Sequence, residues 1–212
     1  GIRTHFMEFL EKARAEEAPW PIPWADEYLK EGDGTISGKR IHEQKQPGLY
    51  TVSYHPIGGC LPPEKPAALY ETIKDMDDTQ VRLAPDGTLY VINLKASEVP
   101  AVLKATDDGA ETLFETSVSC IGASICQHGI QDSQGLLKDC IRRIREENFA
   151  DGVLPKIHIS GCPSSCGSHQ VGSLGFMGQA KKVDGQIRPA FRLFVNGCET
   201  LSDARLGEAG AV

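Results

Sequence analysis

The chain has 212 residues, of which 40% are hydrophobic, and its 22 Lys and Arg against 29 Asp and Glu give a formal net charge of −7. The length and apolar content are sufficient for a globular core, and the acidic balance argues against a general nucleic-acid-binding surface. The sequence lacks a run of about 18 apolar residues and a basic-then-apolar secretory signal, so we expect a cytoplasmic protein without a membrane partner.

Residues 1–46 are expected to form an N-terminal helix and an arm. Phe6, Phe9 and Leu10 recur at near-helical spacing with charges between them, which predicts a helix over about residues 1–18 that Pro19 ends. The following segment, residues 18–24, is rich in Pro and Trp, and we expect it to lie as an extended arm on another surface.

Residues 47–110 show the pattern of a compact α+β unit. Strands are predicted over 49–54, 80–83 and 89–94, and helices over 66–75 and 97–105. The turn 85–87, Pro-Asp-Gly, separates the last two strands. The order β-α-β-β-α is that of a ferredoxin-like half domain.

Residues 111–212 are expected to form an α/β domain that carries four cysteines. A long amphipathic helix is predicted over 132–148, and strands over 156–160, 173–182 and 191–195. Cys140 falls on the apolar stripe of that helix and is interpreted as a buried hydrophobe. The predicted fold class is therefore α+β, a ferredoxin-like half domain followed by an α/β cluster-binding domain.

The cysteine spacing indicates a metal site. Cys120 and Cys126 form a C-x5-C pair, and Cys162 and Cys166 form a C-x3-C pair within a Gly- and Pro-containing loop. Thiolates from two such loops can converge on one iron–sulfur cluster. Seven cysteines in a chain without a secretory signal favour thiols over disulfides. A structural zinc site is an alternative, although C-x5-C is longer than the usual zinc spacing.

Three segments, residues 119–126, 159–167 and 172–178, resemble the sirohaem and [4Fe–4S] signature of the sulfite and nitrite reductase haemoprotein family. Residues 81–89 resemble the ferredoxin-like half domain of the same family, and the likeness covers about residues 47–205. The resemblance implies a [4Fe–4S] cluster held by Cys120, Cys126, Cys162 and Cys166, with Cys166 also serving as proximal ligand of a sirohaem. It further implies that Arg82 is a sirohaem-binding candidate, and Lys156 is a second basic candidate.

The same resemblance implies an activity and partners. Members of the family reduce sulfite to sulfide or nitrite to ammonia by six-electron transfer, and we slightly prefer sulfite here. The small oxyanion would be the substrate, and a separate electron-donor protein would supply electrons. No catalytic residue is assigned; His128 and His169 are candidate proton donors, and the loop of Cys60 can approach the distal face.

Two departures from the family pattern bear on activity. Ser164 stands where Asn is usual, and Asp86 stands where active copies of the turn carry Arg. The chain also shows one half-domain-plus-cluster unit where larger members have two. We therefore expect a homo-oligomer or a second reductase subunit to complete the site. A non-catalytic, cluster-bearing electron-transfer subunit is the main alternative function.

Overall fold

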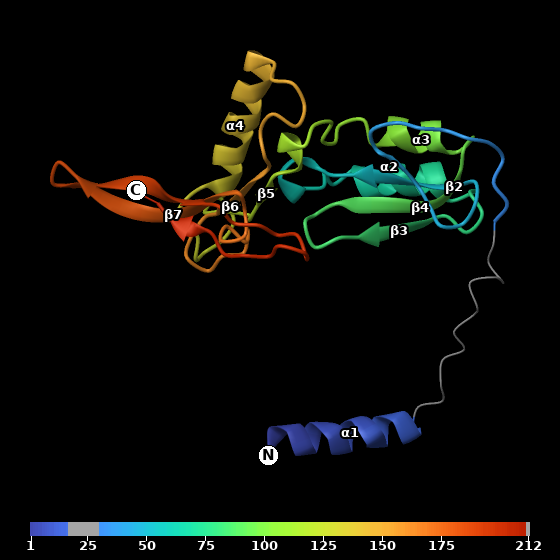
Figure 1. Ribbon diagram of the computed structural model, residues 1–212, viewed down its shortest axis with the longest axis horizontal. Helices are drawn as coiled ribbons and strands as arrows, with labels where there is room; N and C mark the ends of the chain where they lie inside the picture. The colour runs from blue at the N-terminus through green and yellow to red at the C-terminus, as the bar shows by residue number, and fades with distance from the viewer. Residues whose placement is uncertain (17–29, 211–212) are drawn as a thin grey trace. The chain divides into compact units, whose positions relative to one another are not determined.

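The computed structural model describes residues 1–16 and 30–210, and the chain divides into two units, Gly1–Lys30 and Glu31–Val212. The first unit contains helix α1 (Ile2–Glu16), which confirms the predicted N-terminal helix (Figure 1). None of its residues is buried. The predicted Trp- and Pro-rich arm, residues 18–24, lies outside the described ranges. No helix of the described residues is long and apolar enough to cross a membrane.

The first sheet of the second unit is the predicted half domain. Its strands are β1 (Ile41–Glu43), β2 (Leu49–Tyr54), β3 (Gln80–Leu83) and β4 (Leu89–Lys95), antiparallel in the order β1-β2-β4-β3. Helices α2 (Lys65–Ile73) and α3 (Val99–Ala105) lie along this sheet in Figure 1.

The core of this half domain is almost entirely aliphatic. Val52 and Val91 face each other across β2 and β4, and both are fully buried. Leu69 of α2 and Val102 of α3 pack into the same cluster. Because alternate side chains of each strand point to one face, the two helices cover the apolar face of the sheet.

The second sheet has five strands. They are β5 (Val118–Ser119), β6 (Ile157–Ser160), β7 (Leu174–Val183), β8 (Gln186–Val195) and β9 (Glu208–Ala209), in that order. β5, β6 and β7 are parallel, and β8 and β9 are antiparallel to their neighbours. The single-turn helices η2 (Ile57–Gly59) and η3 (Phe114–Thr116) lie before it.

Helix α4 (Ser133–Glu147) connects β5 to β6. Asp132 caps its start by accepting a hydrogen bond from Gly135 N, and Asn148 ends it in the left-handed conformation. Its buried residues Leu137 and Ile141 pack with Ile157 and Ile159 of β6. This contact fixes the helix on the strand that leads to the second cysteine pair.

The α+β fold class is confirmed, the short strands β1, β5 and β9 were not predicted, and the largest difference in a predicted strand is in β8. β8 begins at Gln186 rather than at residue 191. Pro189 hid the first half of this strand in the sequence, because proline lacks an amide donor and is rare inside sheets. In the structure the first residues of β8 pair with β7 alone, and Pro189 lies opposite Ala180. The boundaries 46/47 and 110/111 stay predictions.

Candidate functional site

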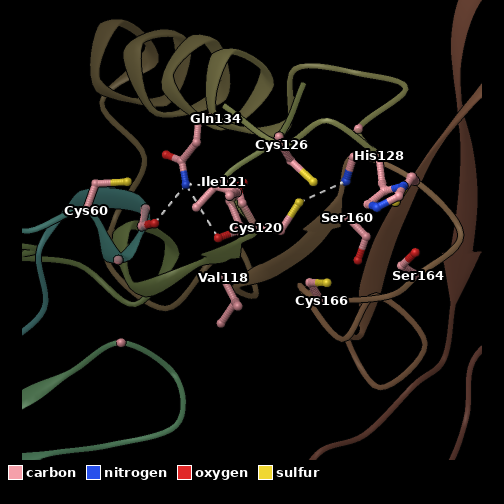
Figure 2. Close-up of a pocket in the computed structure, with 18 of the residues that line it drawn as sticks. Cys60, Val118, Cys120, Ile121, Cys126, His128, Gln134, Ser160, Ser164 and Cys166 are labelled. Atoms are coloured by element: carbon pink, nitrogen blue, oxygen red, sulfur yellow. Dashed lines mark hydrogen bonds between the residues drawn. The ribbon is translucent and has the colours of Figure 1, made fainter. Parts of the chain in front are cut away.

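All four predicted cysteine ligands line one cavity of about 490 Å³. Cys120 directly follows β5 and Cys162 lies two residues after β6. Because β5 and β6 are parallel neighbours, their carboxyl ends lie at the same edge of the sheet, and the two loops start side by side. Figure 2 shows the side chains of Cys120, Cys126 and Cys166 entering this pocket.

The first cysteine loop is held in shape by its backbone. Cys120 N donates to Ile159 O of β6 at 3.0 Å, and Cys126 N donates to Gly122 O at 2.8 Å. Gly122 has a φ of +67°, a conformation that other residues adopt with strain. The loop therefore turns tightly enough to return Cys126 to the pocket that Cys120 lines.

The Cys120 sulfur accepts a backbone hydrogen bond from the second loop. Gly161 N lies 3.1 Å from Cys120 Sγ, and the Ser133 hydroxyl lies 3.1 Å from the same sulfur. A side chain at Gly161 would meet Gln131 O at 2.6 Å, so only glycine permits this approach. N–H donors directed at a sulfur stabilise its anionic form.

The second cysteine loop surrounds a buried serine. Ser160 Oγ accepts from Gly167 N at 3.1 Å and lies 2.9 Å from Nδ1 of His169, which is buried. A Cβ on Gly167 would lie 2.0 Å from Ile159 O, so the loop passes directly over the β6 backbone. Within this loop Cys162 is buried and Cys166 is exposed.

Behind the loop lies a charged cluster on β6. His158 Nδ1 lies 3.1 Å from Gly167 O, and its Nε2 lies 3.4 Å from Glu199. Burial lowers the pKa of His158, and the Glu199 carboxylate opposes that shift. Lys156 forms an ion pair with the same Glu199. Glu199 therefore interacts with His158 of β6 and with Lys156, which directly precedes this strand.

The opposite wall of the pocket comes from the half domain. It consists of residues 58–60 from η2 and its end, and residues 85–87 from the β3–β4 turn. A Cβ on Gly87, whose φ is +87°, would lie 3.1 Å from Gly59 Cα, so glycine keeps these loops in close approach. This wall carries the thiol of Cys60 and the carboxylate of Asp86.

Asp86 is ionised in its surroundings. Burial would raise the pKa of this carboxyl, but hydrogen bonds from the backbone and side chain of Thr88, with the nearby His55 and Lys156, hold it below its usual value. One of these bonds runs from Thr88 N to Asp86 Oδ1 at 3.0 Å. The pocket thus has a negatively charged group in its half-domain wall.

Gln134 joins the two walls, and sequence reasoning missed it. Its Nε2 donates to Gly58 O at 2.9 Å and to Cys120 O at 3.1 Å (Figure 2). Its Oε1 is buried and has no hydrogen-bond partner among the described residues. The only signal in the sequence was its place in the first turn of a helix that follows the first cysteine pair.

The structure does not bring the predicted basic residues to the pocket. Arg82 is exposed on β3 and donates to the side chain of Gln80, and Lys156 is paired with Glu199; neither lines the cavity. His128 and Cys60 do line it. Within residues 1–16 and 30–210, no three His, Cys, Asp or Glu side chains gather around a position for one metal ion.

Comparisons with known proteins show a matching half domain and a matching fold. Residues 42–108 match the nitrite/sulfite reductase ferredoxin-like half domain. A ferredoxin–nitrite reductase of Synechococcus elongatus is 30% identical over 179 residues, which cover 79% of this chain and 33% of the relative. A ferredoxin-type sulfite reductase of Mycolicibacterium paratuberculosis is 23% identical over 206 residues, 91% of this chain and 36% of the relative.

A solved structure shows the same fold. The Mycobacterium tuberculosis NirA protein superposes with a TM-score of 0.69 at 21% identity, over 97% of this chain and 38% of that chain. The chain thus spans about a third of the length of the curated relatives described above. Residues 42–108 thus match the ferredoxin-like half domain of the nitrite and sulfite reductases, and over most of its length the chain is similar to reductases of that family.

Proposed function

We propose that this chain is the cluster-bearing part of a sirohaem- and [4Fe–4S]-dependent reductase that converts sulfite to sulfide or nitrite to ammonia. Cys120, Cys126, Cys162 and Cys166 hold the cluster, and Cys166 also binds the sirohaem iron. The observation that carries this proposal is the convergence of the four thiols from two loops on one cavity. Sulfite remains our slight preference.

The residues present fit a cluster. The donor set consists of thiols, which iron–sulfur clusters require, and Gly161 N already donates to the Cys120 sulfur. Glycines at 58, 59 and 87 leave part of the opposite wall without side chains, and the cavity of about 490 Å³ is larger than a single ion needs. When bound, the cluster and sirohaem would supply the electron transfer to the substrate.

The chain's own groups would position the cofactors and exclude water. Gln134 ties the half-domain loop at Gly58 to the Cys120 carbonyl, which holds the two walls of the pocket together. Arg82 and Lys156 stay candidates for binding the sirohaem carboxylates. Arg82 would first have to break its hydrogen bond to Gln80, and Lys156 its ion pair with Glu199. The electron donor is proposed to be a ferredoxin-type protein, as the names of the relatives indicate.

A second subunit, identical or different, is proposed to complete the substrate site. The ionised Asp86 in the pocket wall would repel an oxyanion, so cations must come from elsewhere. Light scattering on sirohaem-loaded protein should show an oligomer or a complex. A strict monomer that binds sirohaem stoichiometrically would contradict this part of the proposal.

The alternative is a non-catalytic subunit that holds the cluster and passes electrons. Asp86 favours this alternative, because the carboxylate stands where the family pattern has an arginine. Sirohaem-loaded protein should oxidise reduced viologen when sulfite or nitrite is added if the reductase proposal is correct. An intact cluster and sirohaem without either turnover, tested alone and with candidate partner subunits, would favour the alternative.

Cluster binding is tested by anaerobic reconstitution with iron and sulfide. We expect four iron and four sulfide per chain, as the cluster formula requires, a broad visible absorption and an EPR signal on reduction. Cys162→Ser should lose this cluster almost completely. Cys198→Ser is the matched control, because Cys198 bonds Thr200 outside the pocket, and it should retain the cluster. Stoichiometric zinc without visible absorption would instead indicate a structural zinc site.

A further inference from the structure

The outer part of the β7–β8 hairpin, residues 179–192, extends beyond the rest of its sheet. β6 pairs with β7 only over residues 174–177, and β9 pairs with β8 only over residues 194–195. Residues 180–189 are all exposed, and the end of β7 projects away from the rest of the sheet in Figure 1. Two strands alone are marginally stable in water and need a further strand or a packed face.

This outer hairpin nevertheless has a regular structure. Its two turn residues, Asp184 and Gly185, have φ values of +50° and +81°, and positive φ at both positions is what a type I′ turn requires. The pairs from Leu174↔Val195 to Val183↔Gln186 follow one register without a shift. The outer hairpin therefore presents two defined faces.

One of these faces is apolar. Phe191, Pro189 and Ile187 alternate along β8 and share a face, which also carries Ala180 and Lys182 of β7. Phe191 packs against the cluster beneath α4, whereas Ile187 is 78% exposed. The face that covers the core at its inner end therefore continues outward without cover among the described residues.

The outer hairpin also differs in charge from the whole chain. It holds four basic side chains and one acidic side chain, although the chain has a formal net charge of −7. Lys182 lies beside Ile187, and Arg188 and Arg192 lie on the other face. Because opposite charges on two surfaces favour their association, a second copy of this acidic chain is a suitable partner.

The half domain offers a surface with the complementary properties. A cavity of about 260 Å³ lies beside α2, and its lining includes Leu61, Leu69, Tyr70, Ile73 and Val81. Tyr70 is 62% exposed, so the cavity opens at the surface. Small-molecule pockets usually measure roughly 300–1,000 Å³, and this smaller cavity suits an inserted side chain better.

The surroundings of the α2 cavity are acidic. Residues 64–78 and 107–108, which flank it, hold seven acidic side chains and two basic ones. Lys65, one of the two, lines the cavity and is paired with the carboxylate of Asp108. Burial raises the pKa of the lining residue Tyr54 to about 12, and Asp108 and Glu64 add to this rise. The cavity mouth therefore favours cations.

We propose that the outer hairpin of one copy of this chain docks at the α2 cavity of a second copy, with Ile187 in the cavity and the hairpin's basic side chains against the acidic rim. This inference rests on the proposed function in one respect, since it takes the second subunit to be an identical chain. When each copy gives its hairpin to the other, the dimer is closed and contains two such contacts.

An electron donor fits the outer hairpin less well than a second copy does. A Cβ on Gly178 would lie 2.2 Å from the O atom of Gly161, which lines the cysteine pocket. Val183 lies five residues further along β7, which is about 17 Å at the rise of a strand. A donor at the tip would therefore sit away from the cysteines, whereas a second copy can bind there without approaching them.

The contact is tested first by sedimentation velocity on the cofactor-free full chain at low salt. We expect a dimer that added sodium chloride weakens, because salt screens the charges. Ile187→Asp should raise the dissociation constant roughly tenfold or more. Leu201→Asp is the matched control, because Leu201 is 103% exposed and lies on neither surface, and it should associate like the wild type. A monomeric wild type, or unchanged association of Ile187→Asp, would overturn the proposal.

An exchange of charges tests which two surfaces meet. One variant carries Lys182→Glu and Arg188→Glu in the hairpin, and the other carries Glu64→Lys and Asp107→Lys at the cavity rim; all four positions are exposed. Each variant alone should be monomeric, because like charges then meet in the contact. An equal mixture of the two should form a dimer, because every hairpin then faces a rim of opposite charge. Failure of the mixture to associate, with both variants folded by circular dichroism, would contradict the assigned contact.

This inference and the proposed function can fail separately. A loaded wild type that is active as a monomer overturns the inference and leaves the reductase activity standing. A cofactor-free dimer that responds to the variants as described, in a chain that takes up no cluster, leaves the inference standing and refutes the function. If the hairpin variant keeps wild-type association but turns over more slowly with a ferredoxin-type donor, the hairpin binds the donor and the inference is wrong.

Discussion

The two sheets of the unit Glu31–Val212 differ in how many polar side chains are buried beside them. The half domain buries mainly aliphatic side chains such as Val52, Val91 and Leu94, and few polar ones, such as His55. The cysteine-bearing region buries more polar side chains, Ser160 and His169 among them, and these hydrogen-bond one another. Apolar burial is non-directional, whereas hydrogen bonds fix distances and angles. We infer that the first region provides stability and the second provides the loop geometry that aims the cysteines.

The largest expected loss of stability is in the half domain. Leu94→Ala removes a fully buried side chain from the aliphatic cluster and should lower the free energy of unfolding by about 2–5 kcal/mol, measured by urea denaturation. Leu83→Ala is the control, since Leu83 is 80% exposed and its loss should cost little. An equal loss in both variants would contradict the assignment of the stabilising core to this cluster.

A smaller loss with a sharper functional effect is expected in the cysteine region. Ser160→Ala leaves Gly167 N and His169 Nδ1 without their partner and should cost about 1–3 kcal/mol. The second cysteine loop should then loosen, so retention of a reconstituted cluster should fall more than stability does. Ser202→Ala, an exposed serine, should change neither quantity. Full cluster retention in Ser160→Ala would show that the buried hydroxyl does not shape the loop.

The buried histidines should make stability depend on mild acid. Burial lowers the pKa values of His55, His158 and His169 below the ordinary 6.5. Below pH 6.5 the unfolded chain therefore binds more protons than the folded chain. The contribution of these imidazoles to the free energy of unfolding is complete above pH 6.5, and it is lost as the pH falls toward their folded-state pKa values. We expect the free energy of unfolding, measured by urea denaturation, to drop between pH 7.5 and pH 5.5 by up to about 1 kcal/mol per imidazole.

His169→Gln tests this origin of the acid sensitivity. The glutamine does not titrate, so the drop between the two pH values should shrink relative to the wild type even if the variant is less stable at both. An unchanged drop would mean that His169 does not contribute to it.

The smallest effect is expected on the surface of α4. Arg142 pairs with Glu146 at 2.9 Å, but both side chains are more than half exposed. Glu146→Gln should therefore change the free energy of unfolding by less than about 0.5 kcal/mol. A larger change would mean that exposed charges contribute to the stability of the cysteine region as much as its buried groups do.

The sequence predicted the helices, strands and loops better than it predicted the contacts that their side chains make. The strand 49–54 and the cysteine loops were readable because alternation, spacing and glycine are local signals. Local signals could not show that Arg82 would face solvent or that Lys156 would pair with Glu199, forty-three positions further along. Gln134 and His55 were missed for the same reason, since their partners come from distant segments.

The bond between Cys120 N and Ile159 O has a consequence for how the chain is made. The Cys120 loop needs backbone from a strand that leaves the ribosome well after it, since Gly161, which bonds the Cys120 sulfur, is 41 positions later. The half domain, in contrast, is complete once α3 has emerged. During translation the loop of the first cysteine pair therefore lacks its folded conformation while the half domain can already fold. In this interval its thiols are most accessible to oxidation or to a carrier protein.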